Sequence, residues 1–200
     1  MQLVATHLGC RPGDERALFA GLSFDITAGE ALLVTGPNGA GKSSLLRIVA
    51  GYLAPEAGAV TLEGGEDGAP LACQCHYLGH RDGLRAALSV RENLVFFRAL
   101  LGGDGDIAAA LGAVGMARLI DNPVATLSAG QRRRVALARL IAVPRPLWLL
   151  DEPTSALDGA GQEMVAACIE QHLARGGLAL VATHLPIAVP ARRIILGGAS

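Results

Sequence analysis

Aromatic side chains and long uncharged apolar runs are both scarce in this chain of 200 residues, of which only 4% are aromatic. No apolar run approaches the about 20 residues that a helix needs to cross a bilayer. The N-terminal stretch "MQLVATHLGCRPGDE" also lacks the basic segment and apolar run of a secretory signal. Because 51% of the residues are nevertheless hydrophobic, we expect a soluble, cytoplasmic domain with a substantial core.

An excess of charge of either sign is absent as well, since the formal net charge is -1. This balance argues against a nucleic-acid partner, because dedicated nucleic-acid binders usually carry a basic face. We therefore interpret the run Arg132, Arg133 and Arg134 as a solvated helix face with salt bridges. The cysteines match no zinc or haem-attachment spacing and are expected to be reduced thiols that partly line the core. They are Cys10, Cys73, Cys75 and Cys168.

Buried strands alternate with helices along the chain, a pattern typical of an α/β core with a mostly parallel sheet. The apolar run "EALLVT" at residues 30–35 is the first such strand, and "RPLWLLDEP", "LALVATH" and "RRIILGG" predict three more. The first 60-odd residues alternate apolar with polar side chains, which favours an antiparallel β edge.

Residues 89–121 predict helices only. The first helix opens with the capping-box pattern of Ser89 and Glu92, and the last lies around residues 116–121. We expect a single domain over residues 1–200. Its β-rich edge and core would occupy about 1–80 and 122–200, with an α-helical insert at about 81–121 that extends to a helix beginning near Ala129.

The stretch "GPNGAGKSS" fits the phosphate-binding pattern G-x-x-x-x-G-K-[ST] and lies between a predicted buried strand and a predicted helix. Glycines let the backbone wrap around phosphates, and backbone N–H groups with the helix N-terminus supply positive potential. Lys42 would reach the β- and γ-phosphates of ATP, and the Ser43 hydroxyl would ligate Mg²⁺. The candidate ATP-binding residues are Gly36, Pro37, Asn38, Gly39, Ala40, Gly41, Lys42, Ser43 and Ser44.

The apolar run "LWLL" ends in two acidic residues, Asp151 and Glu152. The carboxyl ends of strands in such sheets face the ligand crevice. Asp151 is therefore suited to hold Mg²⁺, and Glu152 to accept a proton from a water that attacks the γ-phosphate. The alternative, that this pair merely caps a helix, stays open at this point.

Between these motifs lies "LSAGQ", and after them come "SALD" and "ATH". With the phosphate loop, these motifs resemble in order those of ABC-type ATPases, whose signature reads L-S-G-G-Q where this chain has Ala129. The resemblance covers essentially the whole chain. It implies an α/β ABC-type P-loop ATPase fold with a mostly parallel core sheet, an antiparallel β edge and an α-helical insert.

The same resemblance implies roles for further residues. His184 would contact the γ-phosphate, and Lys42, Glu152 and His184 would form the catalytic group. The signature would serve the ATP of a second subunit in a head-to-tail pair, here expected to be a homodimer. The residues that would act on the partner's ATP are Ser128, Ala129, Gly130, Gln131 and Asp158. Integral membrane subunits would complete the transporter, with this chain as a peripheral protein on the cytoplasmic face of the inner membrane.

The stretch "CHYLGHRDGL" allows three interpretations. Its "HRD" resembles a kinase catalytic loop, but the kinase context is absent. Cys75, His76 and His80 could instead hold a metal. The resemblance favours a third interpretation, in which His80 takes the place of a glutamine that touches Mg²⁺ or the attacking water at the start of the loop that senses the membrane partner.

"YLGH" and the short chain resemble one branch of the family, the ATP-binding subunits of cytochrome c maturation transporters. That branch implies ATP hydrolysis coupled to haem export and to release of a haem-loaded periplasmic chaperone. Two alternatives remain: an ATPase for another exporter, of drugs or lipids, and a non-transport ABC ATPase. The means of holding adenine is open, since Phe19 is close to the following strand and Arg11 could stack instead.

Overall fold

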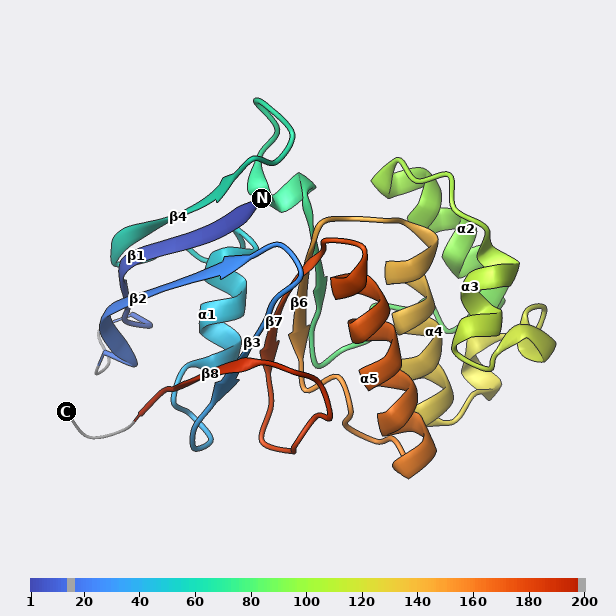
Figure 1. Cartoon of the computed structure of the whole chain (residues 1–200). Helices are drawn as coiled ribbons and strands as arrows, with labels where there is room; N and C mark the ends of the chain where they lie inside the picture. Colours follow the sequence, from blue (N-terminus) through green and yellow to red (C-terminus); the bar gives the residue numbers. More distant parts are fainter. Residues whose placement is uncertain (14–16, 198–200) are drawn as a thin grey trace.

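Two sheets form the frame of the structure, a computed structural model that describes residues 1–13 and 17–197 (Figure 1). The antiparallel sheet has the order β2-β1-β4, and the parallel sheet has the order β5-β6-β7-β3-β8. The strands are β1 Gln2–Cys10, β2 Phe19–Thr27, β3 Ala31–Thr35, β4 Ala57–Glu63, β5 Cys75–Leu78, β6 Leu147–Asp151, β7 Leu178–Ala182 and β8 Arg192–Ile195. The helices are α1 Lys42–Val49, α2 Val90–Leu101, α3 Ile107–Ala113, α4 Ala129–Ala142 and α5 Gly159–Ala174. The expected α/β fold, with its parallel core and antiparallel edge, is confirmed.

The central strands of the parallel sheet are buried on both faces, which explains why they read as unbroken apolar runs. In β6, Leu147 and Leu149 join a core that also contains residues of α1 and the antiparallel sheet. Trp148 and Leu150 alternate with them and join a second core with residues of α4 and α5. Successive side chains of a strand point to opposite faces, so one short strand serves both cores.

The helical insert packs against α4, with α2 and α3 on the far side of that helix from the parallel sheet (Figure 1). Three leucines of these helices are each at most 1% exposed and belong to the same core as Trp148 and Leu150 of β6. They are Leu94, Leu111 and Leu137. The capping box at the start of α2 is confirmed, because Ser89 and Glu92 exchange hydrogen bonds as expected. The boundaries proposed for the insert, at about 81 and 121, remain a prediction.

Two predicted elements differ from the structure. The helix expected around 116–121 is only a 3₁₀ turn, Ala117–Leu119. Gly115 is left-handed at its start, and Pro123 soon follows and disfavours helix in the residue before it. The strand "RRIILGG" is not a buried strand either. β8 lies at the edge of the sheet beside β3, and Ile195 is 69% exposed.

The parallel register brings the carboxyl ends of β3, β6 and β7 to one edge of the sheet. Val34 in β3 and Asp151 in β6 are both register partners of Ala182 in β7. The loops that follow these strands therefore meet, and they contain the candidate catalytic residues. None of the helices in the described ranges is both long and apolar enough to span a membrane.

Candidate active site

The phosphate loop connects β3 to α1 as expected. Gly41 is left-handed directly before α1, and Gly36 has a positive φ of 137°. A Cβ on Gly36 would stand 2.2 Å from the Leu196 carbonyl oxygen, whereas a Cβ on Gly39 would meet nothing within 4 Å. Gly36 thus permits close packing against Leu196, the residue after β8, and Gly39 leaves open space at the loop.

Lys42 lies inside this loop and is only 8% exposed. Its Nζ donates to the carbonyl oxygens of Gly36, at 2.8 Å, and Pro37, at 3.0 Å. It is also the only lysine in the chain. The loop therefore holds an ammonium group where its glycine-rich backbone could receive phosphate oxygens.

Asp151 and Glu152 differ sharply in environment although they are adjacent. Asp151 ends β6, is 4% exposed, and accepts a 3.5 Å hydrogen bond from the Tyr77 hydroxyl at its Oδ2. Glu152 has a positive φ of 49°, a conformation that costs a non-glycine residue about 1–3 kcal/mol. The helix-capping alternative is wrong, because the side chain that caps α5 is that of Asp158.

Glu152 contacts His184, which follows β7. His184 Nδ1 lies 2.8 Å from Glu152 Oε2, and the His184 backbone N–H donates to the same oxygen at 3.4 Å. A hollow of about 330 Å³ lies beside His184 and is lined by residues that also include Gly36 and Thr183. The fold thus places His184 and Gly36, the first glycine of the phosphate loop, on the wall of the same hollow.

The signature residues lie at the start of α4. Ser128 and Gln131 form a capping box in which each side chain accepts from the other residue's backbone N–H. Ser128, Ala129, Gly130 and Gln131 line a hollow of about 580 Å³ together with Asp158. Among the described residues, none from the phosphate loop lines this hollow. The structure therefore groups the signature with Asp158, and it separates that group from the phosphate loop of the same chain.

The three arginines of α4 do not form one solvated face. Arg134 makes the expected salt bridge, 3.4 Å to Asp158 Oδ1, and Arg132 donates to the Leu127 carbonyl. Arg133, in contrast, is 2% exposed. It shares a face of α4 with the buried Leu137, four residues on, and this helical spacing is the signal that would have revealed it.

The loop after β5 does not hold a metal in the way one interpretation required. His76 is buried and its Nε2 contacts the Val143 carbonyl, while His80 is exposed. Burial lowers the pKa of His76 to about 3. Cys75 and His76 are consecutive in a strand and point to opposite faces. In the ranges that the structure describes, no group of three or more histidine, cysteine or acidic side chains could bind a metal ion together.

The two residues considered for adenine, Arg11 and Phe19, lie at the same end of the β1–β2 pair, where Cys10 is the register partner of Phe19. Arg11 pairs with Glu56, with 2.9 Å between Nε and Oε1. Phe19 begins β2, and its Cδ1 would be 3.1 Å from a Cβ on Gly41. Phe19 therefore lies against the phosphate loop, and it is as close to the following strand as expected, since it is the first residue of β2.

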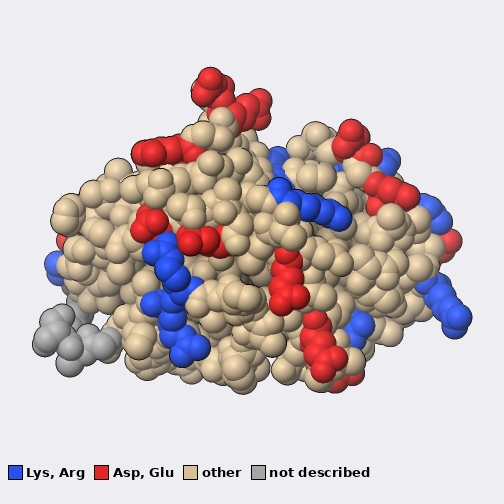
Figure 2. All heavy atoms as spheres, viewed as in Figure 1, with Lys and Arg blue, Asp and Glu red and all other residues tan. Residues whose placement is uncertain are grey.

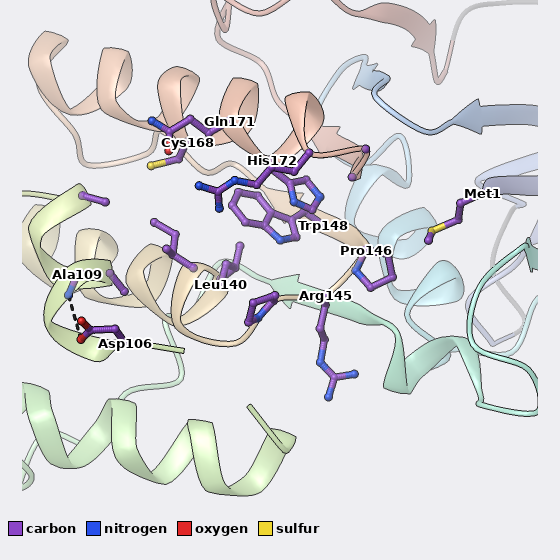
Figure 3. Close-up of a pocket in the computed structure, with 17 residues that line it drawn as sticks. Met1, Asp106, Ala109, Leu140, Arg145, Pro146, Trp148, Cys168, Gln171 and His172 are labelled. Carbon is purple, nitrogen blue, oxygen red and sulfur yellow. Dashed lines mark hydrogen bonds between the residues drawn. The ribbon is translucent and has the colours of Figure 1, made fainter. Parts of the chain in front are cut away.

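A further hollow lies at the amino end of β6 (Figure 3). It measures about 600 Å³ and lies between the ends of α3, α4 and α5. On its wall, Trp148 and His172 stack with ring centroids 4.1 Å apart. Asp151 is at the other end of the same strand, so this hollow is separate from the candidate active site.

Charged side chains of both signs are interspersed on the face seen in Figure 2. Arg192, for example, forms salt bridges with two acidic residues, Asp25 and Glu30, each 3.4 Å from its Nη2.

The groups at the carboxyl ends of β3 and β6 are suited to bind a nucleotide together with Mg²⁺. The loop offers open glycine backbone and an ammonium group to phosphates, and the Ser43 hydroxyl and the buried Asp151 carboxylate are hard oxygen donors of the type that Mg²⁺ prefers. A phosphate loop, a strand-end carboxylate pair and a histidine around one edge define the class of P-loop nucleotide hydrolases.

Comparison with known proteins makes this class more specific. The sequence pattern of the ABC transporter family matches residues 19–155. The "Cytochrome c biogenesis ATP-binding export protein CcmA" of Rhodopseudomonas palustris (strain BisB5) is 54% identical over 201 residues and covers 100% of both chains. A Bradyrhizobium diazoefficiens protein of the same name is 51% identical and covers 99% of both chains. This chain therefore belongs to the ABC transporter family, in the group of cytochrome c biogenesis ATP-binding export proteins.

Solved structures agree on the fold. A putative ABC transporter ATP-binding protein from Pyrococcus furiosus superposes with a TM-score of 0.86, at 24% identity over 98% of both chains. A bacterial Atm1-family ABC exporter with ATP bound gives a TM-score of 0.82, at 22% identity over 98% of this chain and 36% of that one. At these identities the likeness supports the ABC ATPase fold alone.

Proposed function

We propose that this chain is the ATP-hydrolysing subunit of an ABC transporter complex for cytochrome c biogenesis and haem export. The observation that carries the proposal is the full-length similarity to proteins of that name, together with a phosphate loop, an acidic strand end and a histidine at one edge of the sheet. In this role the chain converts ATP and water to ADP and phosphate, and the reaction supports release of a haem-loaded periplasmic chaperone.

Lys42 binds the β- and γ-phosphates in this proposal. Its Nζ is directed at the carbonyls of Gly36 and Pro37, so phosphate oxygens would take over as its partners. The remaining loop residues, from Asn38 to Ser44, supply backbone N–H groups and the α1 N-terminus. Ser43 and Asp151 would hold Mg²⁺, with His80 as a further candidate. Bound Mg²⁺ would neutralise the charge that develops on the phosphates.

Glu152 is the proposed general base. It would accept the proton of the water that attacks the γ-phosphorus, as the bond from that phosphorus to the bridging oxygen breaks. The contact with His184 fixes the direction of the Glu152 carboxylate and leaves the other ring nitrogen of His184 for a γ-phosphate oxygen.

A second copy of the chain completes each site in this proposal. The hollow lined by Ser128, Ala129, Gly130, Gln131 and Asp158 includes the N-terminus of α4, which favours an anion. Since the phosphate loop of the same chain does not line it, the phosphates of a partner's ATP are its proposed occupant. Integral membrane subunits are the other proposed partners, and they would hold the chain at the cytoplasmic face of the inner membrane.

Deletion of the gene tests the biological role. We expect the deletion strain to lose mature periplasmic c-type cytochromes, measured by haem staining and absorbance. The wild-type gene should restore them, as should Glu170→Gln, which alters an exposed glutamate of α5. Glu152→Gln should fail to restore them. Normal maturation in the deletion strain would refute the role in cytochrome c biogenesis and leave the ATPase assignment intact.

A further inference from the structure

Arg133 is a buried residue near the candidate active site whose guanidinium donates five hydrogen bonds. Its five N–H groups are matched by five acceptors: the carbonyl oxygens of Gly79, Asp151, Glu152 and Pro153, and Asp82 Oδ1. The distances run from 2.7 Å, for Nη2 to Asp151 O, to 3.2 Å, for Nε to Pro153 O. A guanidinium has five donors in a planar fork, so Arg133 uses its full capacity.

One side of this fork holds the backbone of the proposed catalytic base. Nη2 and Nε bind three consecutive carbonyls, those of Asp151, Glu152 and Pro153. Glu152 is the residue with a positive φ in this turn, and a strained residue persists only where its surroundings fix it. The same turn directs the Glu152 carboxylate to His184.

The other side of the fork holds the loop after β5. Nη1 donates to the Gly79 carbonyl at 2.8 Å and to Asp82 Oδ1 at 3.1 Å, so His80 lies in the segment between two anchors. His80 and Arg81 are exposed, whereas the Asp82 side chain is only 21% exposed and supplies a carboxylate that balances the buried charge.

We propose that Arg133 is a positioning residue that couples the loop after β5 to the Glu152 carboxylate. A shift of Gly79 or Asp82 changes the position of the guanidinium, and the same guanidinium sets the turn from which Glu152 projects. A membrane partner that moves the exposed part of the loop thereby adjusts the general base through one side chain. The inference rests on the proposed role of Glu152 as the base.

Steady-state ATP hydrolysis by the full-length protein, purified with its membrane subunits, tests the proposal in Arg133→Gln, Arg133→Lys and Asp82→Asn. We expect kcat to fall about 10- to 100-fold in both Arg133 variants, as is typical when a catalytic group is misplaced. KM for ATP should stay within about twofold, because no contact with the nucleotide is removed. Lysine should not rescue, since its three donors cannot serve five acceptors.

Arg139→Gln is the matched control. Arg139 is also buried and lies on α4, but it donates to the Tyr77 carbonyl and stacks on Phe97, away from the turn at 151–153. We expect its kcat to stay near that of the wild type. An equal loss of kcat in Arg139→Gln would overturn the proposal and indicate a general loosening of α4.

Three other results would overturn the proposal: wild-type kcat in Arg133→Gln, full rescue by lysine, or an effect on KM alone. Should the Arg133 variants fail to fold, Asp82→Asn decides. It keeps the shape of the side chain and removes the charge that anchors the loop, so kcat should fall at unchanged KM, and wild-type kcat would refute the coupling. Undiminished hydrolysis by Glu152→Gln would instead refute the proposed base, which distinguishes the two failures.

Discussion

His184 Nδ1 lies 2.8 Å from Glu152 Oε2, although the two residues are 32 positions apart in the sequence. They meet because β6 and β7 are parallel neighbours whose carboxyl ends lie side by side, with Asp151 opposite Ala182. The contact gives the exposed histidine a fixed partner and gives the carboxylate a direction.

The first prediction concerns Glu152. Glu152→Gln should lower kcat for ATP hydrolysis by about 10²-fold or more, because the amide cannot accept the proton of the attacking water. ATP binding, measured by equilibrium titration, should be retained, and a nucleotide-trapped dimer should accumulate in size-exclusion chromatography. Glu170→Gln is the control. Turnover comparable with that of the wild type in Glu152→Gln would contradict the assignment.

The second prediction uses the fact that Lys42 is the only lysine in the chain. An amine-reactive reagent has only Lys42 and the N-terminal amine to modify. Since Lys42 faces the inside of the phosphate loop, bound MgATP should protect it and leave the N-terminal amine reactive. Mass spectrometry of peptides labelled with and without MgATP measures this. Equal labelling of Lys42 in both samples would refute its proposed contact with phosphates.

A third experiment tests the partner's contribution to each site. Ala129→Glu places a negative charge in the exposed first turn of α4, where it suits the helix but should repel a phosphate. Ala129→Glu and Lys42→Ala should each be inactive alone. Mixing equal amounts should restore about a quarter of the wild-type rate, since half of the dimers then contain one intact site. No recovery on mixing would argue against the head-to-tail homodimer.

The fourth prediction concerns His80 and magnesium. If His80 takes the place of a glutamine, His80→Gln should keep most of the turnover, whereas His80→Ala should raise the Mg²⁺ concentration for half-maximal activity about three- to tenfold. Activity measured across a magnesium titration tests this. The exposed neighbour provides the control, since Arg81→Ala should leave the Mg²⁺ dependence unchanged. An unaltered magnesium curve in His80→Ala would exclude a metal-linked role.

The fifth prediction concerns acid stability. Burial lowers the pKa of His76 from 6.5 to about 3 and that of His172 from 6.5 to about 4. The unfolded chain therefore binds more protons as pH falls. The stabilisation from keeping both histidines neutral is complete above pH 6.5 and is lost progressively toward about pH 4 and about pH 3.

Each of these two histidines should lower the free energy of unfolding by about 1.4 kcal/mol for every unit that the pH falls within that window. Urea unfolding at about pH 7.5 and about pH 5 measures the loss. His172→Gln should reduce the pH dependence. A free energy of unfolding that is the same at both pH values would contradict the burial argument.

Much of the site was predictable from sequence because its chemistry is local. A phosphate loop needs glycines, a lysine and a hydroxyl at fixed spacing after a buried strand, and an acidic pair needs only to follow another such strand. These patterns predicted the phosphate loop at 36–44 and the roles of Asp151 and Glu152, and the order of the motifs along the chain indicated the ABC-type fold. The strands β3, β6 and β7 were also predictable as unbroken apolar runs, because both faces of these strands are buried.

Only the tertiary structure decided which arginine of α4 is buried, which aromatic lies against the phosphate loop and which apolar strand is an edge. Arg133 is buried because its acceptors come from two loops remote from α4 in sequence, after β5 and after β6. Helical spacing gives the relative direction of neighbouring side chains, but the strands and loops opposite them determine what each one meets. The sequence by itself therefore determined which chemical groups this chain carries, and the packing of distant segments determined how the candidate catalytic residues are held in place.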